Sequence, residues 1–220
     1  MKLEGKSIAF LGDSITEGTG VDDKENNRYD HVIQQRCSLK AVYNYGIGGS
    51  RLAHQKIPSQ NPRHDLCFCG RARDMNHDAD IIVVYGGGND YLHGDAPVGA
   101  PGDATPATFY GAVEWLMSFL KTEYENKTIV FLTPAHCRFD KAPHKHPSKQ
   151  PDAMPLAEYV RIIEETAAKH HIPTLNLYEK LGLDPNIPEI MEEYAPDGLH
   201  FNDKGHAIIA DRIIRFLEEL

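Results

Sequence analysis

Short runs of apolar residues alternate along the chain with longer stretches in which apolar residues recur every three or four positions. The apolar runs predict β-strands at residues 7–11, 41–45, 80–85, 128–132 and 174–177. The amphipathic stretches predict helices at residues 28–38, 105–124, 156–171 and 203–220. Nearly continuous β-branched runs that alternate with helices are typical of a parallel sheet covered on both faces. The pattern therefore predicts an α/β protein with three layers, in which a central parallel sheet of about five strands lies between helices.

The chain has 220 residues and shows neither an internal repeat nor a linker, so we expect a single domain over residues 1–220. Two longer segments, residues 54–77 and 134–155, lack a regular pattern. Irregular segments of this length in a compact domain usually serve as binding loops or lids.

Composition narrows the classes of partner. The formal net charge is −9, and no basic run is present, which disfavours nucleic acid because phosphate binding depends on Lys and Arg. No apolar stretch approaches the roughly 20 residues that span a bilayer. The first residues contain no apolar segment of signal-peptide length, so a cytoplasmic location is expected, or a secreted one if a leader has been removed.

The four cysteines are too few for a disulfide scaffold, so reduced thiols are expected. Cys67 and Cys69, with His64 and His77 nearby, suggest zinc, but their spacing is shorter than that of zinc sites and no second pair follows. A solvated or partly buried loop is the favoured interpretation. A second group of potential ligands is also interpreted as a loop: His136, Cys137, His144 and His146. No metal and no cofactor are expected.

Glycine-rich polar segments follow each of the first three predicted strands. They are residues 12–14 (Gly-Asp-Ser), residues 44–49 (Asn-Tyr-Gly-Ile-Gly-Gly) and residues 86–90 (Gly-Gly-Gly-Asn-Asp). Each alone could be a strand-ending turn. The carboxyl ends of parallel strands form the ligand crevice of an open sheet, and glycine lets the backbone approach a ligand closely. The three segments together therefore predict a binding site at this edge.

A fourth segment, Asp197-Gly198-Leu199-His200, precedes the last predicted helix. A serine hydroxyl becomes a nucleophile when a neutral imidazole can take its proton, and a carboxylate fixes the tautomer of that imidazole. Ser14, His200 and Asp197 would meet this requirement. The alternative is that Ser14 merely caps a helix. Asp13 is either a rival acid or, more simply, an organiser of the turn.

In combination, these segments resemble the four signature blocks of the SGNH hydrolases, also called the GDSL esterase/lipase superfamily. The blocks occur in the order of the family and span residues 12–200. The resemblance implies a flavodoxin-like αβα fold, Ser14 as nucleophile, His200 as general base and then acid, and Asp197 as its orienting partner. It also implies an oxyanion hole made by the Ser14 N–H, the Gly49 N–H and the Asn89 amide.

Three further residues are expected to support this site. Gly49 rather than Gly48 is assigned to the oxyanion hole because it lies five positions after Asn44, as in the family pattern. Asn44 is expected to support the glycine turn, and Asp90 to bond the backbone or the second block. Ile15 stands where the family usually has leucine.

Acyl transfer fits these residues, because preorganised donors to the developing oxyanion supply the largest single stabilising effect. We therefore predict a serine carboxylic ester hydrolase that forms an acyl-serine intermediate on a small-molecule ester. Polar loop residues favour short acyl groups, such as acetyl esters of sugars: Asn61, Arg63, Arg71 and Arg73. One alternative is a lysophospholipase or thioesterase. Another is a non-catalytic, flavodoxin-like binding module, which would not require His200. The phosphate-loop, dinucleotide and Gly-x-Ser-x-Gly motifs are absent from the sequence.

Overall fold

The computed structural model describes residues 1–138, 140–141 and 154–220. Its centre is one sheet of five strands in the order β2-β1-β3-β4-β5, and every neighbouring pair is parallel. The strands are β1 (Ser7–Gly12), β2 (Ala41–Gly46), β3 (Ile81–Tyr85), β4 (Thr128–Leu132) and β5 (Thr174–Leu175). This is the flavodoxin-like order, which reverses between β1 and β3. The predicted α/β class with a central parallel sheet is confirmed.

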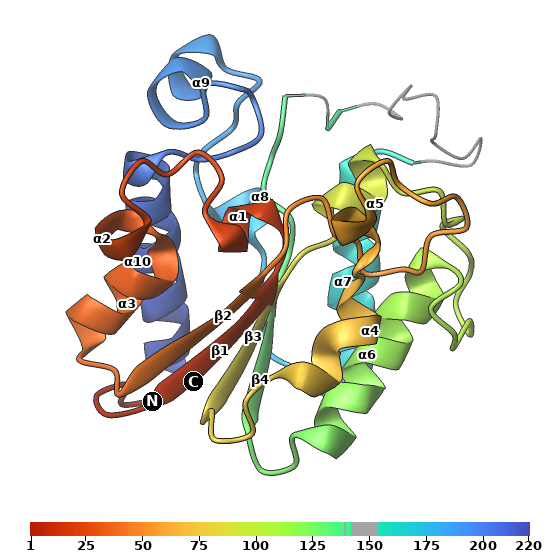
Figure 1. Ribbon diagram of the computed structural model, residues 1–220, viewed down its shortest axis with the longest axis horizontal. Helices are drawn as coiled ribbons and strands as arrows, with labels where there is room; N and C mark the ends of the chain where they lie inside the picture. The colour runs from red at the N-terminus through yellow and green to blue at the C-terminus, as the bar shows by residue number, and fades with distance from the viewer. Residues whose placement is uncertain (139, 142–153) are drawn as a thin grey trace.

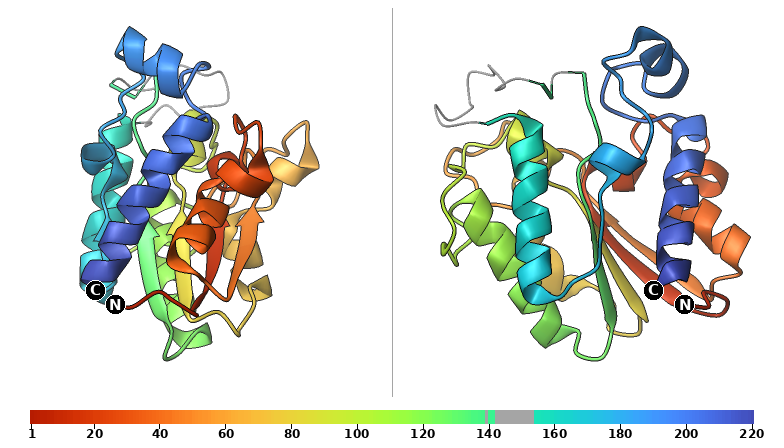
Figure 2. Two further views of the ribbon diagram at one scale, coloured as in Figure 1. Left: turned by 90° about the vertical axis from the view of Figure 1, so that its left-hand side faces the viewer. Right: turned by 180° about the vertical axis from the view of Figure 1, so that it is seen from behind.

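Helices cover both faces of the sheet (Figures 1 and 2). One face carries α3 (Tyr29–Cys37) and α10 (Asp203–Glu219). The other carries α4 (Phe68–Arg71), α6 (Phe109–Glu123) and α7 (Leu156–His170). The predicted three layers are therefore present.

Each face of the sheet has its own apolar core, because successive side chains of a strand point to opposite faces. In β1, Ala9 and Leu11 pack with α4, α6 and α7, whereas Ile8 and Phe10 pack with α3 and α10. All four are fully buried. Burying a side chain of this kind stabilises the fold by roughly 1.5–3 kcal/mol, so the alternation in β1 helps to hold both helical layers in place.

Two predicted boundaries are wrong. The helix expected from residue 105 begins at Phe109, because the Thr108 side chain accepts a hydrogen bond from the Gly111 N–H and caps it there. The last strand ends at Leu175 rather than at residue 177, because Asn176 caps the next helix. The other predicted strands and helices agree with the structure within one residue at each end.

The prediction that residues 54–77 lack regular structure is also wrong. This segment contains η1 (Pro62–Asp65), α4 and η2 (Ala72–Asp74). The Asn61 and Cys67 side chains cap the first two of these by accepting backbone hydrogen bonds. Of the second segment, 134–155, residues 139 and 142–153 lie outside the described residues, and so do His144 and His146.

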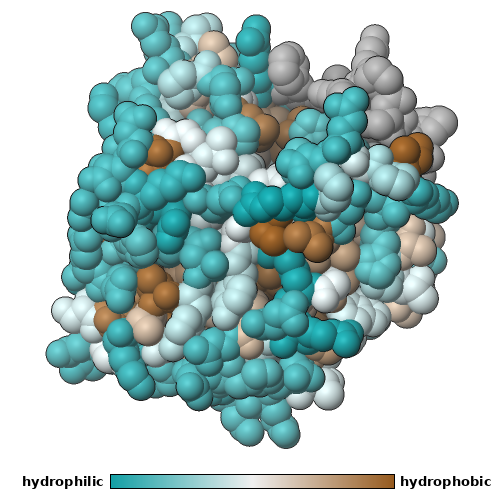
Figure 3. All heavy atoms as spheres, viewed as in Figure 1, coloured by the Kyte–Doolittle hydropathy of each residue, from teal (hydrophilic) through white to brown (hydrophobic). Residues whose placement is uncertain are grey.

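Further short helices decorate the sheet edges: α1 (Ser14–Glu17), α2 (Lys24–Asn27), α5 (Gly88–Leu92), α8 (Leu177–Lys180) and α9 (Pro188–Tyr194). Hydrophilic side chains predominate on the face drawn in Figure 3, and hydrophobic ones form small groups there. In the described parts of the chain, no helix is long and apolar enough to cross a membrane.

Candidate active site

The segments after β1, β2 and β3 meet at the carboxyl edge of the sheet, where α1 and α5 begin (Figure 1). Two glycines permit this close packing. A Cβ atom on Gly12 would lie 1.8 Å from Thr16 Oγ1, and one on Gly46 would lie 2.2 Å from Glu17 N. Helix α1 therefore packs directly onto the strand ends, which places Ser14 at the edge of the sheet.

Ser14 is the first residue of α1 and is largely buried. The N-cap is Asp13, whose Oδ1 accepts a hydrogen bond from the Ile15 N–H at 3.0 Å. The alternative interpretation of Ser14 as the helix cap is therefore wrong. Because Asp13 fills the capping role, the Ser14 hydroxyl is left to make other contacts.

Ser14, His200 and Asp197 form a continuous chain of polar contacts. His200 Nε2 lies 2.9 Å from Ser14 Oγ, and His200 Nδ1 lies 2.6 Å from Asp197 Oδ2. An ionised carboxylate can only accept a hydrogen bond, so the ring proton belongs on Nδ1 and the Nε2 lone pair faces the serine hydroxyl. This is the arrangement in which an imidazole can take a proton from serine.

Asp197 is held by its own loop. Partial burial acts to raise its pKa, but hydrogen bonds from the His200 ring and from the N–H groups of His200 and Leu199 outweigh this effect and lower the pKa. Asp197 is therefore anionic at neutral pH, and its carboxylate can only accept a hydrogen bond from the neighbouring imidazole.

Three donor groups are candidates for hydrogen bonding to a substrate at the serine hydroxyl. The Ser14 N–H is at the N-terminus of α1, and the Asn89 side chain lines the same cavity as Ser14. One Asn89 amide hydrogen is donated to Ser50 O at 3.2 Å, and a primary amide has a second one to offer. The Gly48 N–H donates to Glu17 at 2.7 Å and is occupied, which leaves Gly49 as the candidate in this turn.

Asn44 and Asp90 tie the glycine turns to their neighbours. Asn44 Oδ1 accepts from the Gly46 N–H, and its amide donates to Thr16 O. The Asp90 carboxylate accepts from two backbone N–H groups, those of Leu52 and Ala53. Both residues bond backbone, and Asp90 joins α5 to the segment that follows the Gly48–Gly49 turn.

Burial raises the pKa of Asp13 to about 6. The Ile15 N–H and the charges of His200 and Arg71 act in the opposite direction but do not compensate for the loss of hydration. Asp13 is thus a buried acid near His200 rather than a hydrogen-bonded partner of its ring.

Arg71 is a site residue whose role the sequence did not reveal. It donates to Gly12 O at 2.7 Å, to Ser50 Oγ at 2.8 Å and to Tyr45 O. These partners belong to the segments that follow β1 and β2. No local sequence signal identifies such an arginine, because its partners are distant in the chain and become neighbours only in the folded sheet.

The other polar loop residues have different positions. Arg63 pairs with Glu17 on α1, next to the glycine turn. Arg73 lies over the Phe119 ring of α6 and does not line the crevice as expected.

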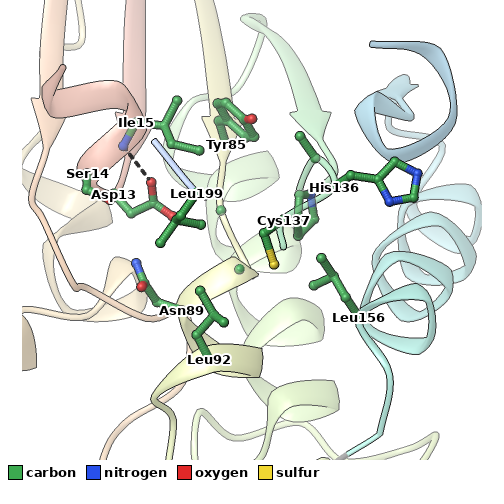
Figure 4. Close-up of a pocket in the computed structure, with 14 residues that line it drawn as sticks. Asp13, Ser14, Ile15, Tyr85, Asn89, Leu92, His136, Cys137, Leu156 and Leu199 are labelled. Carbon is green, nitrogen blue, oxygen red and sulfur yellow. Dashed lines mark hydrogen bonds between the residues drawn. The ribbon is translucent and has the colours of Figure 1, made fainter. Parts of the chain in front are cut away.

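A small cavity of about 30 Å³ adjoins Ser14 (Figure 4). Its wall opposite Ser14 and Asn89 is largely apolar, and Leu92, Cys137 and Leu156 turn toward the enclosed space. The His136 ring, by contrast, points away from the cavity in Figure 4. Its Nδ1 atom contacts the Asp140 carboxylate. The space beside the serine is therefore narrow and lined mainly by carbon and sulfur.

The cysteines near the site have packing roles. Cys67 and Cys69 are buried at the start of α4, so the expected solvated or partly buried loop is instead a buried helical turn. Cys67 Sγ accepts from the Gly70 N–H, and Cys69 Sγ donates to Ala112 O. The described residues contain no group of three or more His, Cys, Asp or Glu side chains placed to hold a metal ion.

Comparison with known proteins identifies a family and several similar structures. Residues 10–208 match the model of a family described as GDSL-like Lipase/Acylhydrolase. A crystal structure of a protein from Lactobacillus plantarum is 29% identical, with a TM-score of 0.82 over 98% of both chains. No curated protein sequence matches the chain.

Two more distant structures share the fold. An acetyl xylan esterase is 22% identical, with a TM-score of 0.65 over 95% of this chain and 98% of its own. A lipase/acylhydrolase from Enterococcus faecalis is 21% identical, with a TM-score of 0.62 over 97% of this chain and 96% of its own.

Proposed function

The chain belongs to the GDSL-like lipase/acylhydrolase family, and from this membership and its site we propose that it is a serine carboxylic ester hydrolase. The single observation that carries the proposal is the relay in which His200 lies 2.9 Å from Ser14 Oγ and 2.6 Å from Asp197 Oδ2. A binding module would not require a base aligned on a buried serine.

In the first half of the reaction, Ser14 Oγ attacks the ester carbonyl carbon while His200 Nε2 takes the hydroxyl proton. Asp197 stabilises the resulting imidazolium. The oxyanion accepts hydrogen bonds from the Ser14 N–H, the Gly49 N–H and the Asn89 amide. When the tetrahedral intermediate collapses, its bond to the alcohol oxygen breaks and His200 returns the proton to that oxygen.

The second half repeats these steps with water. His200 removes a proton from the water as it attacks the acyl carbon, and the same donors hold the second oxyanion. Breaking the bond to Ser14 Oγ releases the carboxylic acid, and His200 returns the proton to the serine. The enzyme is regenerated with no external reactant except water.

The small cavity supports a short acyl group. Its volume is only about 30 Å³, and Leu92, Cys137 and Leu156 bound it opposite Ser14. A methyl group fits such a space, whereas an octanoyl chain does not. We therefore favour short acyl esters, with acetyl esters of sugars among them, over the lysophospholipase or thioesterase alternative.

The test uses p-nitrophenyl acetate with the wild type and Ser14→Ala. We expect Ser14→Ala to lose at least a thousandfold in kcat, because the nucleophile is gone. Ser118→Ala removes an exposed serine on α6 and is the matched control, expected to keep full activity. Equal rates for wild type and Ser14→Ala would remove the enzyme proposal and favour a non-catalytic module.

Two further measurements sharpen the assignment. A fluorophosphonate should label Ser14, and an adduct on another residue would refute this nucleophile. Among acetyl, butyryl and octanoyl esters, kcat/KM should be highest for the acetyl ester. A preference for octanoyl esters would instead support the long-chain alternative.

A further inference from the structure

A second, much larger hollow borders the candidate site at Gly49. Its volume is about 600 Å³, and it lies mainly within the segment between β2 and α4. This segment, orange in Figure 1, lies above the carboxyl edge of the sheet beside α5. We call it the 51–64 hollow after the residues that form most of its lining: Arg51, Gln55, Ile57, Gln60, Asn61 and His64.

The 51–64 hollow is adjacent to the proposed nucleophile. A Cβ atom on Gly48 would lie 3.7 Å from Ser14 Cβ, and one on Gly49 would lie 2.7 Å from the His64 ring. The Gly48–Gly49 turn therefore has Ser14 on one side and the hollow on the other. An ester whose acyl group occupies the small cavity beside Ser14 can direct its alcohol part into this hollow.

Arg51 supplies an unsatisfied donor. It is only 7% exposed, and its Nη1 donates to Ser59 Oγ and His64 O, both at 3.0 Å. Its Nε is buried and has no hydrogen-bond partner among the residues that the structure describes. A buried donor without a partner costs about 1–3 kcal/mol, so a ligand oxygen that accepts from Arg51 would remove this cost.

The two charged side chains that line the hollow, Arg51 and Asp95, already have partners. Arg51 lies 3.6 Å from Asp65, and Asp95 accepts backbone hydrogen bonds from Lys56 and Ile57. Since these charges already have partners, the hollow does not select an ionic ligand. A neutral ligand with many hydrogen-bonding groups fits better.

The remaining lining offers the contacts that such a ligand needs. Gln60 and Asn61 are exposed, and each side-chain amide can both donate and accept hydrogen bonds. Ile57 is 62% exposed and offers an apolar surface to the C–H groups of a ring. Hydroxyl groups and an apolar ring face occur together in a sugar.

We propose that the 51–64 hollow binds the alcohol part of the ester and that this alcohol is a neutral sugar. The inference rests on the proposed esterase function, because it assigns the leaving-group side of the same site. The hydroxyl groups of the sugar bond Gln60, Asn61 and Arg51 Nε, while the scissile acetyl group lies at Ser14.

The kinetic test compares 6-O-acetylglucose with ethyl acetate. Both are acetyl esters of primary alcohols, but only the first carries a sugar ring. We expect the wild type to favour 6-O-acetylglucose at least tenfold in kcat/KM. The double variant Gln60→Ala/Ile57→Ser should lower this preference about tenfold through KM, while ethyl acetate hydrolysis stays unchanged. Gln35→Ala removes an exposed amide on α3 and should change neither substrate.

A binding measurement separates this proposal from the proposed function. Calorimetry of 6-O-acetylglucose with Ser14→Ala requires no turnover, and we expect binding that Arg51→Met and the double variant each weaken about tenfold. Circular dichroism reports whether Arg51→Met folds. If Arg51→Met does not fold, the binding test rests on the double variant, whose two substituted positions are exposed.

The outcomes are distinct. A wild type that hydrolyses both esters equally, together with no binding to Ser14→Ala, would overturn the sugar subsite and leave the esterase proposal standing. Binding to Ser14→Ala without hydrolysis of any ester by the wild type would overturn the esterase proposal, and the hollow would then be a sugar site of a binding protein.

Discussion

A histidine beside a serine acts as a base only when its proton lies on the nitrogen that faces away from the serine. In this protein the Asp197 carboxylate enforces that tautomer, although its side chain is 56% exposed. The contact is therefore important for the tautomer of His200 rather than for the stability of the fold, because exposed ion pairs contribute little.

Asp197→Asn tests this distinction. The amide can donate to His200 Nδ1, which would place the ring proton on Nε2 and leave no lone pair for Ser14. We expect kcat for p-nitrophenyl acetate to fall by roughly 10³- to 10⁴-fold with little change in KM or in melting temperature. Glu193→Gln alters a nearby exposed carboxylate and should leave kcat unchanged. An Asp197→Asn protein with wild-type kcat would show that Asp197 does not orient the base.

The strand ends depend on Arg71 as a common anchor. Its guanidinium bonds the carbonyls of Gly12 and Tyr45 and the hydroxyl of Ser50. Ser50 O in turn accepts from the Asn89 amide. Burial lowers the pKa of Arg71, to about 10, so it stays cationic at neutral pH. One side chain thus connects the segments that carry Ser14, Gly49 and Asn89.

Arg71→Lys and Arg71→Met should therefore disturb the donors to the oxyanion without touching the substrate. We expect kcat to fall about 10- to 100-fold for Arg71→Met, with KM nearly constant and a smaller loss for Arg71→Lys. Arg73→Lys, at an exposed position two residues away, should change neither parameter. A rise in KM at constant kcat would contradict a positioning role for Arg71.

The first turn of α7 determines how deep the small cavity is. Leu156 is its first residue and is almost fully buried against the cavity. Leu156→Ala should raise the butyryl-to-acetyl ratio of kcat/KM roughly tenfold, because removed methyl groups make room for added methylenes. Both variants should lose about 2–5 kcal/mol of stability, but Leu120→Ala in α6 should leave this ratio unchanged. Equal ratios in the two variants would place the acyl group elsewhere.

The long elements could be predicted because their patterns are strong. The Ile-Ile-Val-Val run of β3 and the amphipathic face of α10 each fix an element almost to the residue. The helices α1, α2, α5 and α8 have only four or five residues, too few to show a helical period. Their caps, such as Asp13 and Asn176, are ordinary polar residues in the sequence.

The site could be predicted only where it is local. Asp197 and His200 are three positions apart, and the glycine turns follow recognisable strands. Arg71 and the 51–64 hollow could not be predicted, because their partners come together through the packing of several segments. The sequence predicts Arg71 as one of several polar loop residues, whereas in the structure it is half-buried against the strand ends.

At the scale of the whole molecule, two buried ionisable groups act on stability with opposite signs. Burial raises the pKa of Asp13 to about 6 from 3.8. The folded state therefore keeps a proton that the unfolded chain has released, and stability falls as the pH rises from about 4 to 6. Burial lowers the pKa of His206 to about 4 from 6.5, so stability falls as the pH drops from 6.5 to 4.

Between pH 4 and 6 these two effects oppose each other. A substitution that removes one of the two groups should therefore reveal the pH dependence of stability that the other contributes. Relative to the wild type, Asp13→Asn should gain stability as the pH rises, by roughly 3 kcal/mol at pH 7. His206→Gln, which keeps an acceptor for the Tyr29 N–H, should lose relative stability over the same range. Urea unfolding at pH 4.5, 5.5 and 6.5 measures both differences in stability, and the double variant should restore the wild-type slope of stability against pH.

Parallel curves of stability against pH for all four proteins would mean that neither group titrates differently in the folded and unfolded states. Opposite slopes would instead show that the buried Asp13 beside the candidate active site and the buried His206 of α10 together flatten the pH dependence of folding.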